Sequence, residues 1–441
     1  MAEVGLYTAL SGIEAETTAM DATSNNVANA NTAGFVREQA QFSAVPTGGV
    51  LVAGIQQVTS QLQQANALSA TSSSSAASAF QNLLSTAQSS FPEPGADGLQ
   101  SQLSSFWSSW DDVANDPSQL ASRTQVVNFA TNMVSGLNQA SANLSQLQQS
   151  SASQVSSVTA EVNNLLSQIA ALNKSAVAAG SNGAANGLVD QRNALLNSLA
   201  GDIGITVRPQ SDGSVNVYAG GLALVQGATA DSLSVSSSGG TVSVTSAHTG
   251  TAVPITQGTI GGLLQGINQS IPTYQARIDQ VASALATTVN TQLAAGQTAA
   301  GAPGQPLFVA IGGGAVTAAS ISVNPPVAAD PTLLAAAAAG AGPLDGSNAQ
   351  AMAELASSPT GPDQSYRIMI GDLGSDVQAA TSLASTQAVF SQQASAADQA
   401  VSGVNTDEEM VNMLRYQHGY EAAAKVITTL SSTIESLLAA V

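Results

Sequence analysis

The chain has 441 residues, of which only 8% are charged and 4% aromatic. Twenty-eight acidic residues against nine basic ones give a net charge of −19, which makes nucleic acid and anionic surfaces unfavourable partners. The chain has no cysteine, and its only histidines are His248 and His418. This composition leaves little material for thiol catalysis, a disulfide framework or a histidine-based metal site, so we expect no enzyme and no cofactor.

Hydropathy gives no sign of a membrane protein. No apolar run reaches the roughly 18 residues that a membrane-spanning helix requires, so we expect no membrane insertion. The first ten residues, MAEVGLYTAL, lack the basic region of a cleavable signal peptide. If the protein is secreted, we therefore expect another export route.

Residues 2–30 predict one amphipathic helix. Its seam repeats at spacings of three and four, with polar Thr17 and Ser24 at two of the positions. A seam of this period requires a partner helix. Its apolar members are Leu6, Leu10, Ile13, Met20 and Val27. Residues 35–60 read as extended chain.

The next segments predict helices at 61–90 and 99–113, with Trp107 and Trp110 as packing anchors of the second. Asp116-Pro117-Ser118 then opens a very long helix that ends at Gly180-Ser181-Asn182-Gly183. Its seam from Val126 to Leu172 keeps three-four spacing except for one stutter between Ser151 and Val155, which unwinds a supercoil without ending the helix. At 1.5 Å per residue this seam covers roughly 70 Å and predicts a rod.

A short helix at 190–199 precedes five β runs between 203 and 244, which are separated by Asp212-Gly213, Gly220-Gly221 and Gly239-Gly240. These runs predict a small β domain at 201–257, and two strands within 300–330, near Phe308 and Ile321, are candidates to extend it. Helical pattern returns at 258–293, interrupted at Pro272, and again at 366–402. The predicted fold is mainly α with an inserted β module. Its expected parts are a terminal helical assembly domain (1–60 and 403–441), a long-helix bundle (61–200 and 258–402) and the small β domain.

The last helix carries a second seam, with the apolar members Met413, Tyr416, Tyr420, Ala423, Ile427, Leu430, Ile434, Leu437 and Val441. Thr406 followed by Glu409 fits a capping box, which places Asp407 and Glu408 in the first turn, where the helix dipole favours negative charge. We favour this interpretation over a cation site.

Matching seams at the two ends indicate that the ends meet, within one molecule or in an assembly. Burying each large seam residue contributes about 1.5–3 kcal/mol, against roughly 1–2 kcal/mol of backbone entropy for every ordered residue. The two terms nearly cancel because only about one residue in 3.5 lies on the seam. We therefore expect these surfaces to be completed mainly by neighbouring subunits, which favours a building block over an enzyme.

Several motifs resemble the flagellar axial proteins. Ser11 to Ala15 and Thr23 to Phe35 are similar to the N-terminal signature of rod, hook and hook-associated proteins. Gly403 to Glu409 and Leu414 to Ile427 resemble, within that superfamily, the hook-associated protein 1 family of junction proteins between hook and filament. Three interior segments are similar to the same family: Val189–Asn193, Gly220–Gly227 and Gly258–Leu264. Two departures are Ala33, where the family usually has proline, and a short interior that suggests a reduced or missing outer domain.

The resemblance implies an extracellular structural subunit of the bacterial flagellum, exported unfolded through the type III apparatus. It further implies a homo-oligomeric ring at the distal end of the hook, beneath the filament, assembled through the terminal coiled-coil helices. The implied partners are the hook protein, the second hook-associated protein and an export chaperone at the C-terminal helix. The alternatives are another flagellar axial subunit, of hook or rod, and a secreted coiled-coil adhesin.

Overall fold

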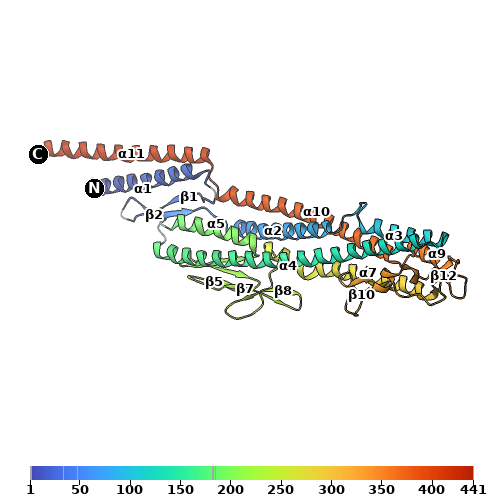
Figure 1. Cartoon of the computed structure of the whole chain (residues 1–441). Coiled ribbons are helices and arrows are strands. Elements are labelled where there is room, and N and C mark those ends of the chain that lie inside the picture. Colours follow the sequence, from blue (N-terminus) through green and yellow to red (C-terminus); the bar gives the residue numbers. More distant parts are fainter. Residues whose placement is uncertain (1, 33, 47, 181–182, 184, 441) are drawn as a thin grey trace.

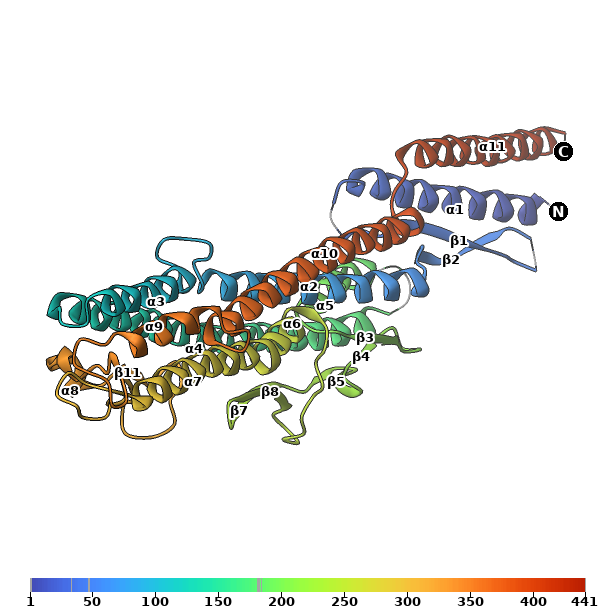
Figure 2. The same cartoon turned by 90° about the vertical axis from the view of Figure 1, so that its right-hand side faces the viewer.

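The computed structural model describes residues 2–32, 34–46, 48–180, 183 and 185–440. The molecule is a long rod whose two chain ends lie next to each other at one end (Figures 1 and 2). Its length follows from α4 (Leu120–Ala179), which runs unbroken for 60 residues, or about 90 Å. The predicted long helix is thus confirmed. It ends before Gly180 as expected, while Ser181 and Asn182 of the predicted terminator lie outside the described residues.

The other predicted helices and strands are present, with modest changes of boundary. The remaining helices are α1 (Ala2–Asn29), α2 (Gln61–Ser89), α3 (Leu99–Asn115), α5 (Asn186–Asp202), α6 (Gly258–Gln265), α7 (Ile271–Ala295), α8 (Pro325–Ala329), α9 (Ser347–Glu354), α10 (Pro362–Ser402) and α11 (Thr406–Ala439). The strands are β1 (Glu38–Ala44), β2 (Val50–Gln57), β3 (Thr206–Pro209), β4 (Val215–Ala219), β5 (Leu222–Gln226), β6 (Thr229–Ala230), β7 (Leu233–Ser238), β8 (Thr241–Ser246), β9 (Gly296–Gln297), β10 (Phe308–Ala310), β11 (Ile321–Val323) and β12 (Ala337–Ala338).

The body of the rod is a helical bundle with one continuous apolar core. Helix α10 packs along α2, α2 against α6, and α3 and α5 against α4. Trp107 and Trp110 are buried in this core, with the Phe106 ring edge-on to both. The prediction that the tryptophans are packing anchors is confirmed.

The interruption predicted at Pro272 is a change of helical winding. A single π-helical turn, Gly266–Ser270, joins α6 to α7. Pro272 then lies in the first turn of α7, just after the π turn in which the Ile271 N–H bonds to the Gly266 carbonyl; the proline itself has no N–H to donate. The chain therefore continues through the proline as one helical path.

The inserted β module lies on one flank of the bundle and consists of two sheets (Figure 1). One has the order β3-β4-β5-β6, and the other is the hairpin β7-β8. Strands β10 and β11 pair only with each other among the described strands; β11 packs on α4 and β10 on α7. The expectation that they extend the small β domain is wrong, because the hydrophobic side chains Phe308 and Ile321 enter the bundle core at another part of the rod.

At the end that holds both termini, α1, α11 and the hairpin β1-β2 form what we call the terminal unit (Figure 2). It has a small core of its own, formed by Ala19, Ala40 and Tyr416 with Met20 packed against them. No helix or strand of the terminal unit packs extensively against one of the body. Among the described residues, no helix is long and apolar enough to cross a membrane.

Candidate assembly site

Helices α1 and α11 lie side by side and antiparallel, in one register along their shared length (Figure 1). Gly5 lies against Leu430, Gly12 against Ala423, Ala19 packs with Tyr416, and Asn26 is hydrogen-bonded to Glu409. Each step of seven residues along α1 is matched by a step of seven back along α11. The two ends of the chain therefore meet within one molecule.

Small side chains on α1 allow this close approach. A Cβ placed on Gly5 would lie 3.1 Å from Leu430 Cδ1, and one on Gly12 would lie 3.6 Å from Ala423 Cβ. The apolar pattern did not reveal these positions because glycine and alanine carry little weight in it. The signal that could have found them is the recurrence of Gly5, Gly12, Ala19 and Asn26 at intervals of seven.

The predicted seam on α1 is offset by one residue from the residues that contact α11. Leu6 and Leu10 are exposed, while Ile13, Met20 and Val27 are half-buried along the edge of the pair. On α11 the prediction fits better. Tyr416 is buried, Leu430 contacts Gly5, and Met413 and Ile427 are half-buried, whereas Tyr420, Ile434 and Leu437 are exposed. Val441 lies outside the described residues.

A polar pair, Asn26 and Glu409, lies where the C-terminal part of α1 meets the N-terminal part of α11. Asn26 is fully buried, and its Nδ2 donates to Glu409 Oε2 at 3.1 Å and to the Glu38 carbonyl at 2.8 Å. Its Oδ1 accepts the Glu38 N–H at 2.8 Å, so one side chain ties α1, β1 and α11 together. Buried polar groups of this kind favour a single register, because any slip leaves them without partners.

The cap predicted for α11 is wrong by one residue. Asn405 is the N-cap, and its Oδ1 accepts the N–H groups of Asp407 and Glu408. Thr406 is instead the first helical residue, and the Glu409 carboxylate turns inward to Asn26. The sequence is compatible with either Asn405 or Thr406 as the N-cap. The hydrogen bond from Asn26 to Glu409 favours Asn405. In the part of the chain that the structure describes, no group of acidic residues or histidines is arranged to hold a metal ion.

The hairpin β1-β2 lies along α1 and covers Tyr416. The Phe42 ring meets the Tyr416 ring edge-on with centroids 6.5 Å apart, and Arg415 lies 5.0 Å from the Tyr416 centroid. Ser11 Oγ accepts the Val50 N–H, which fixes β2 on the helix. Burial raises the pKa of the nearby Glu16 carboxyl, and the positive charge of Arg415 partly offsets this rise.

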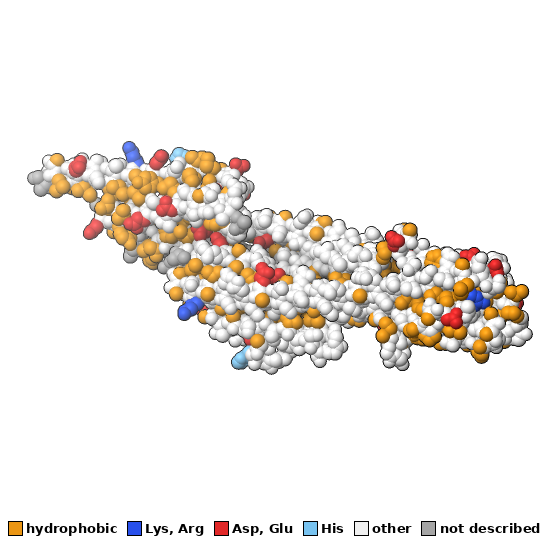
Figure 3. Space-filling model, viewed as in Figure 1, with side chains coloured by type: hydrophobic (Ala, Val, Ile, Leu, Met, Phe, Trp, Pro, Cys, Tyr) orange, Lys and Arg blue, Asp and Glu red, His pale blue; other side chains and the backbone are white. Residues whose placement is uncertain are grey.

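Apolar side chains remain uncovered on the terminal unit, as its hydrophobic patches in Figure 3 show. They come from both ends of the chain. They include Val4, Leu6, Tyr7 and Leu10 from α1 and Met410, Val411, Leu414, Val426, Ile434, Leu437 and Leu438 from α11. The much longer body also exposes large apolar side chains, but they are spread along the rod: Leu62, Leu120, Val177, Ile311, Leu344, Ile368, Leu383, Val389 and Phe390.

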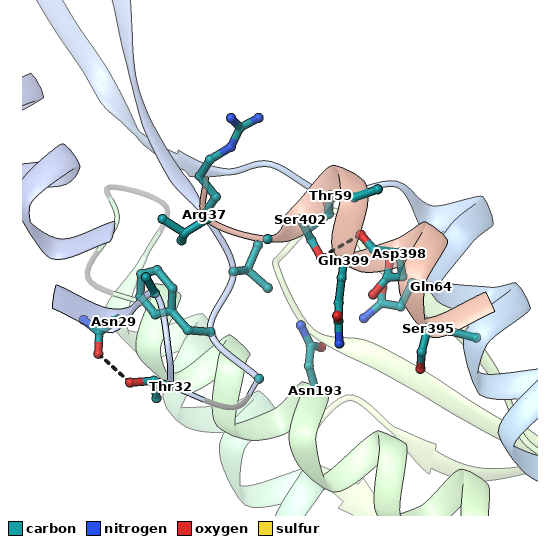
Figure 4. A pocket seen from close by; sticks show the side chains of 18 of the residues that line it. Asn29, Thr32, Arg37, Thr59, Gln64, Asn193, Ser395, Asp398, Gln399 and Ser402 are labelled. Atoms are coloured by element: carbon teal, nitrogen blue, oxygen red, sulfur yellow. Dashed lines mark hydrogen bonds between the residues drawn. The ribbon is translucent and has the colours of Figure 1, made fainter. Parts of the chain in front are cut away.

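A polar hollow of about 970 Å³ separates the terminal unit from the body. Figure 4 shows its lining, with Asn29 at the end of α1, Thr32 just after it, Asn193 on α5, and Asp398 and Gln399 on α10. Burial raises the pKa of the Asp398 carboxyl. Amides and hydroxyls make up most of the polar lining of the hollow. This arrangement is suited to a joint, and the described lining residues form no obvious acid–base pair.

A rod-shaped helical body, joined to a unit built from both chain ends, defines a structural subunit of an elongated assembly. A family model described as "Flagellar hook-associated protein FlgK helical domain" matches residues 84–308. Models for the C-terminal region of the flagellar basal body rod proteins FlgEFG and for flagellar basal body rod proteins match residues 399–440 and 6–35. The chain belongs to the flagellar hook-associated protein FlgK family.

Relatives agree over nearly the whole chain. Flagellar hook-associated protein 1 of Escherichia coli K12 is 26% identical over 545 residues, covering 98% of this chain and 98% of that protein. The protein of the same name from Bacillus subtilis 168 is 26% identical over 502 residues, covering 99% and 97%. Both aligned lengths exceed 441 residues, so these relatives carry residues without counterparts here.

The fold also matches a solved structure. The flagellar hook junction protein FlgK from Burkholderia pseudomallei superimposes with a TM-score of 0.70 at 18% identity, covering 77% of this chain and all of that one. Together these findings make the chain a structural subunit of the flagellar hook–filament junction and decide against a hook or rod subunit and an adhesin. It is part of the flagellum, an extracellular appendage. The family's usual proline position, Ala33 here, lies outside the described residues.

Proposed function

We propose that the terminal unit is the surface through which copies of this chain join into a ring at the tip of the hook. The observation that carries the proposal is the row of exposed apolar side chains beside a helix pair already closed within the molecule. Leu10 is 48% exposed and Leu437 is 64% exposed, although both belong to the predicted seams. Apolar side chains that the molecule's own partner helix leaves uncovered are suited to a neighbouring copy.

We infer that the same unit contacts the hook protein on one side and the second hook-associated protein on the other. Before export through the type III apparatus, a chaperone would cover the C-terminal part of α11. The exposed Ile434, Leu437 and Leu438 support this assignment. No catalytic role is part of the proposal.

The roles that we propose for the parts of the chain follow from the two separate cores. We assign residues 1–60 and 403–441 to assembly, 61–200 and 258–402 to a stiff bundle, and 201–257 to an outward-facing β module. The small core around Tyr416 is separate, among the described residues, from the large core around Trp110, which supports the division of the terminal unit from the rest; the β module shares the large core.

The test is a double variant, Leu10→Asp with Leu437→Asp, expressed in cells that lack the native protein. Each substitution puts a charge on the exposed surface and leaves the α1–α11 contacts intact, so the purified monomer should keep its helical circular dichroism. We expect no labelled protein at hook tips, no filaments and no motility. Leu344→Asp is the matched control, since Leu344 is 73% exposed in a loop far from the terminal unit. Normal filaments in the double variant, or loss of filaments in the control alone, would contradict the proposal.

A further inference from the structure

Polar groups form much of the joint between the terminal unit and the body. Two short stretches of chain cross it, at residues 58–60 and 403–405, and Gly34 to Arg37, in the loop between α1 and β1, lie beside it. Two backbone hydrogen bonds hold the crossing chains together, from Arg37 N to the Ser402 carbonyl and from Val58 N to the Arg37 carbonyl, each at 2.8 Å. The hollow described above lies beside them and leaves part of the joint unpacked.

One side chain of the body docks the base of the hairpin. Asp190, on α5, accepts Gln57 Nε2 of β2 at 2.6 Å and is also hydrogen-bonded to the backbone of Val36. Asn186, one turn earlier, donates to Glu38 Oε1 of β1 at 2.8 Å. Asp190 therefore contacts both the loop before β1 and the hairpin. No other described carboxylate of the body does so.

We propose that Asp190 is a positioning residue whose protonation fixes the terminal unit against the body. When the carboxyl is neutral, Gln57 and Val36 keep their acceptor and no charge is buried. When it is ionised, docking places a negative charge close to Glu38, in a site where burial excludes water. The terminal unit is then held less firmly and the hollow gives it room to move.

The electrostatics of the joint support this direction. Burial raises the pKa of Asp190 from its usual 3.8 to about 6, the hydrogen bonds from Gln57 and Val36 oppose the rise, and Glu38 adds to it. The other charged groups at the joint are Arg37 and Glu408, paired at 3.2 Å, and Asp398 across the hollow.

The sign follows from linkage. A carboxyl whose pKa is raised in the docked state favours docking most below its undocked pKa, and this contribution is lost as pH rises through about 6. Between pH 5 and pH 8 the docking equilibrium should weaken by about tenfold on the shift given for Asp190.

Hydrogen exchange of the full chain in dilute solution measures the joint directly. The reporters are the N–H groups of Val36, Arg37 and Val58, read at pH 5 and pH 8 after correction for intrinsic exchange rates. We expect about tenfold greater protection at pH 5 in the native sequence. Asp190→Asn keeps an acceptor without the charge, so it should be protected at both pH values, and Asp190→Ala at neither.

Asp202→Asn is the matched control. Asp202 lies on the same helix and its pKa is also raised to about 6, by burial and then by Glu161, away from the joint. This variant should keep the native pH response at the three reporters. The proposal would be overturned by equal protection at the two pH values in the native chain, which includes no protection at either. It would also be overturned by a pH response that survives in Asp190→Asn. The measurement uses the monomer alone, so its outcome is independent of whether the terminal unit forms the ring.

Discussion

Asn26 donates its side-chain amide to the carboxylate of Glu409, which lies 383 residues further along the chain. Both side chains are buried, and the same amide group holds the backbone of Glu38 on both its N–H and its carbonyl. A single asparagine thus connects the first helix, the first strand and the last helix of the protein. The predictions below begin from this contact.

Replacing Asn26 with alanine should weaken the terminal unit by about 2–3 kcal/mol, because a buried carboxylate and two backbone groups lose their partners. The loss should appear as faster hydrogen exchange in residues 409–430, with the body unchanged. Asn25→Ala is the control, since Asn25 is exposed and bonds only to the side chain of Glu38 and to Asn29. Equal effects of the two substitutions would show that the buried contact does not set the stability of the unit.

A disulfide should form between Gly12→Cys and Ala423→Cys. The Cβ positions are 3.6 Å apart, within the range of about 3.5–4.5 Å found across disulfides, and the chain has no other cysteine. Oxidation should give a monomer of increased electrophoretic mobility that reverts on reduction. Thr17→Cys with Ala423→Cys is the control that should not close, since Thr17 lies on the exposed face of α1. Disulfide-linked dimers as the main product would mean that the helices pair between molecules instead.

Asn173→Ala should loosen the β module from the rod. The buried side chain of Asn173 donates to the carbonyls of Val215 and Gly227, both at 2.8 Å, and accepts from Val215 N and from Arg192 Nη1. Its removal should cost about 2–3 kcal/mol of local stability, seen as lost protection in residues 206–230. Asn164→Ala, on the exposed side of the same helix, should change little. Unchanged protection in the Asn173 variant would exclude this anchor.

Asp202→Asn should stabilise the body at pH 5 and stabilise it further at pH 8. Burial raises the pKa of Asp202 to about 6, so its contribution to stability is present at low pH and is lost as pH rises through that value. The difference in Tm between variant and native chain should therefore grow from pH 5 to pH 8. Asp212→Asn is the control whose Tm difference should not change between pH 5 and pH 8, because hydrogen bonds from Ser214 lower the pKa of exposed Asp212 and leave it ionised at both pH values. A Tm difference that is independent of pH would rule out the titration of Asp202.

Sequence reasoning succeeded where long apolar periodicity or turn chemistry determines structure. The seam from Val126 to Leu172 predicted α4, and the glycine pairs at 220–221 and 239–240 marked the turns of the β module. Each of these signals is local, because neighbouring residues settle it without help from the rest of the fold.

The assembly site was less predictable for two physical reasons. Contacts between α1 and α11 are built on Gly5, Gly12 and Ala19, where a missing side chain matters more than a present one. The positions of Asn26, Glu409 and Asp190 depend on partners hundreds of residues or several elements away, which no local pattern contains. Large residues such as Leu6 and Leu10 correctly indicated that this helix has a partner. They lie beside the positions that contact α11 and not at them.

The register of α1 against α11 also acts as a test of chain integrity. A copy that has lost the residues after about 405 keeps the bundle core and the β module, yet its first helix has nothing opposite Gly5, Gly12 or Asn26. Degraded or prematurely terminated copies can therefore fold a rod and still lack the unit that we assign to assembly. Only copies that retain both ends would be admitted to the growing structure, without any separate factor to inspect them.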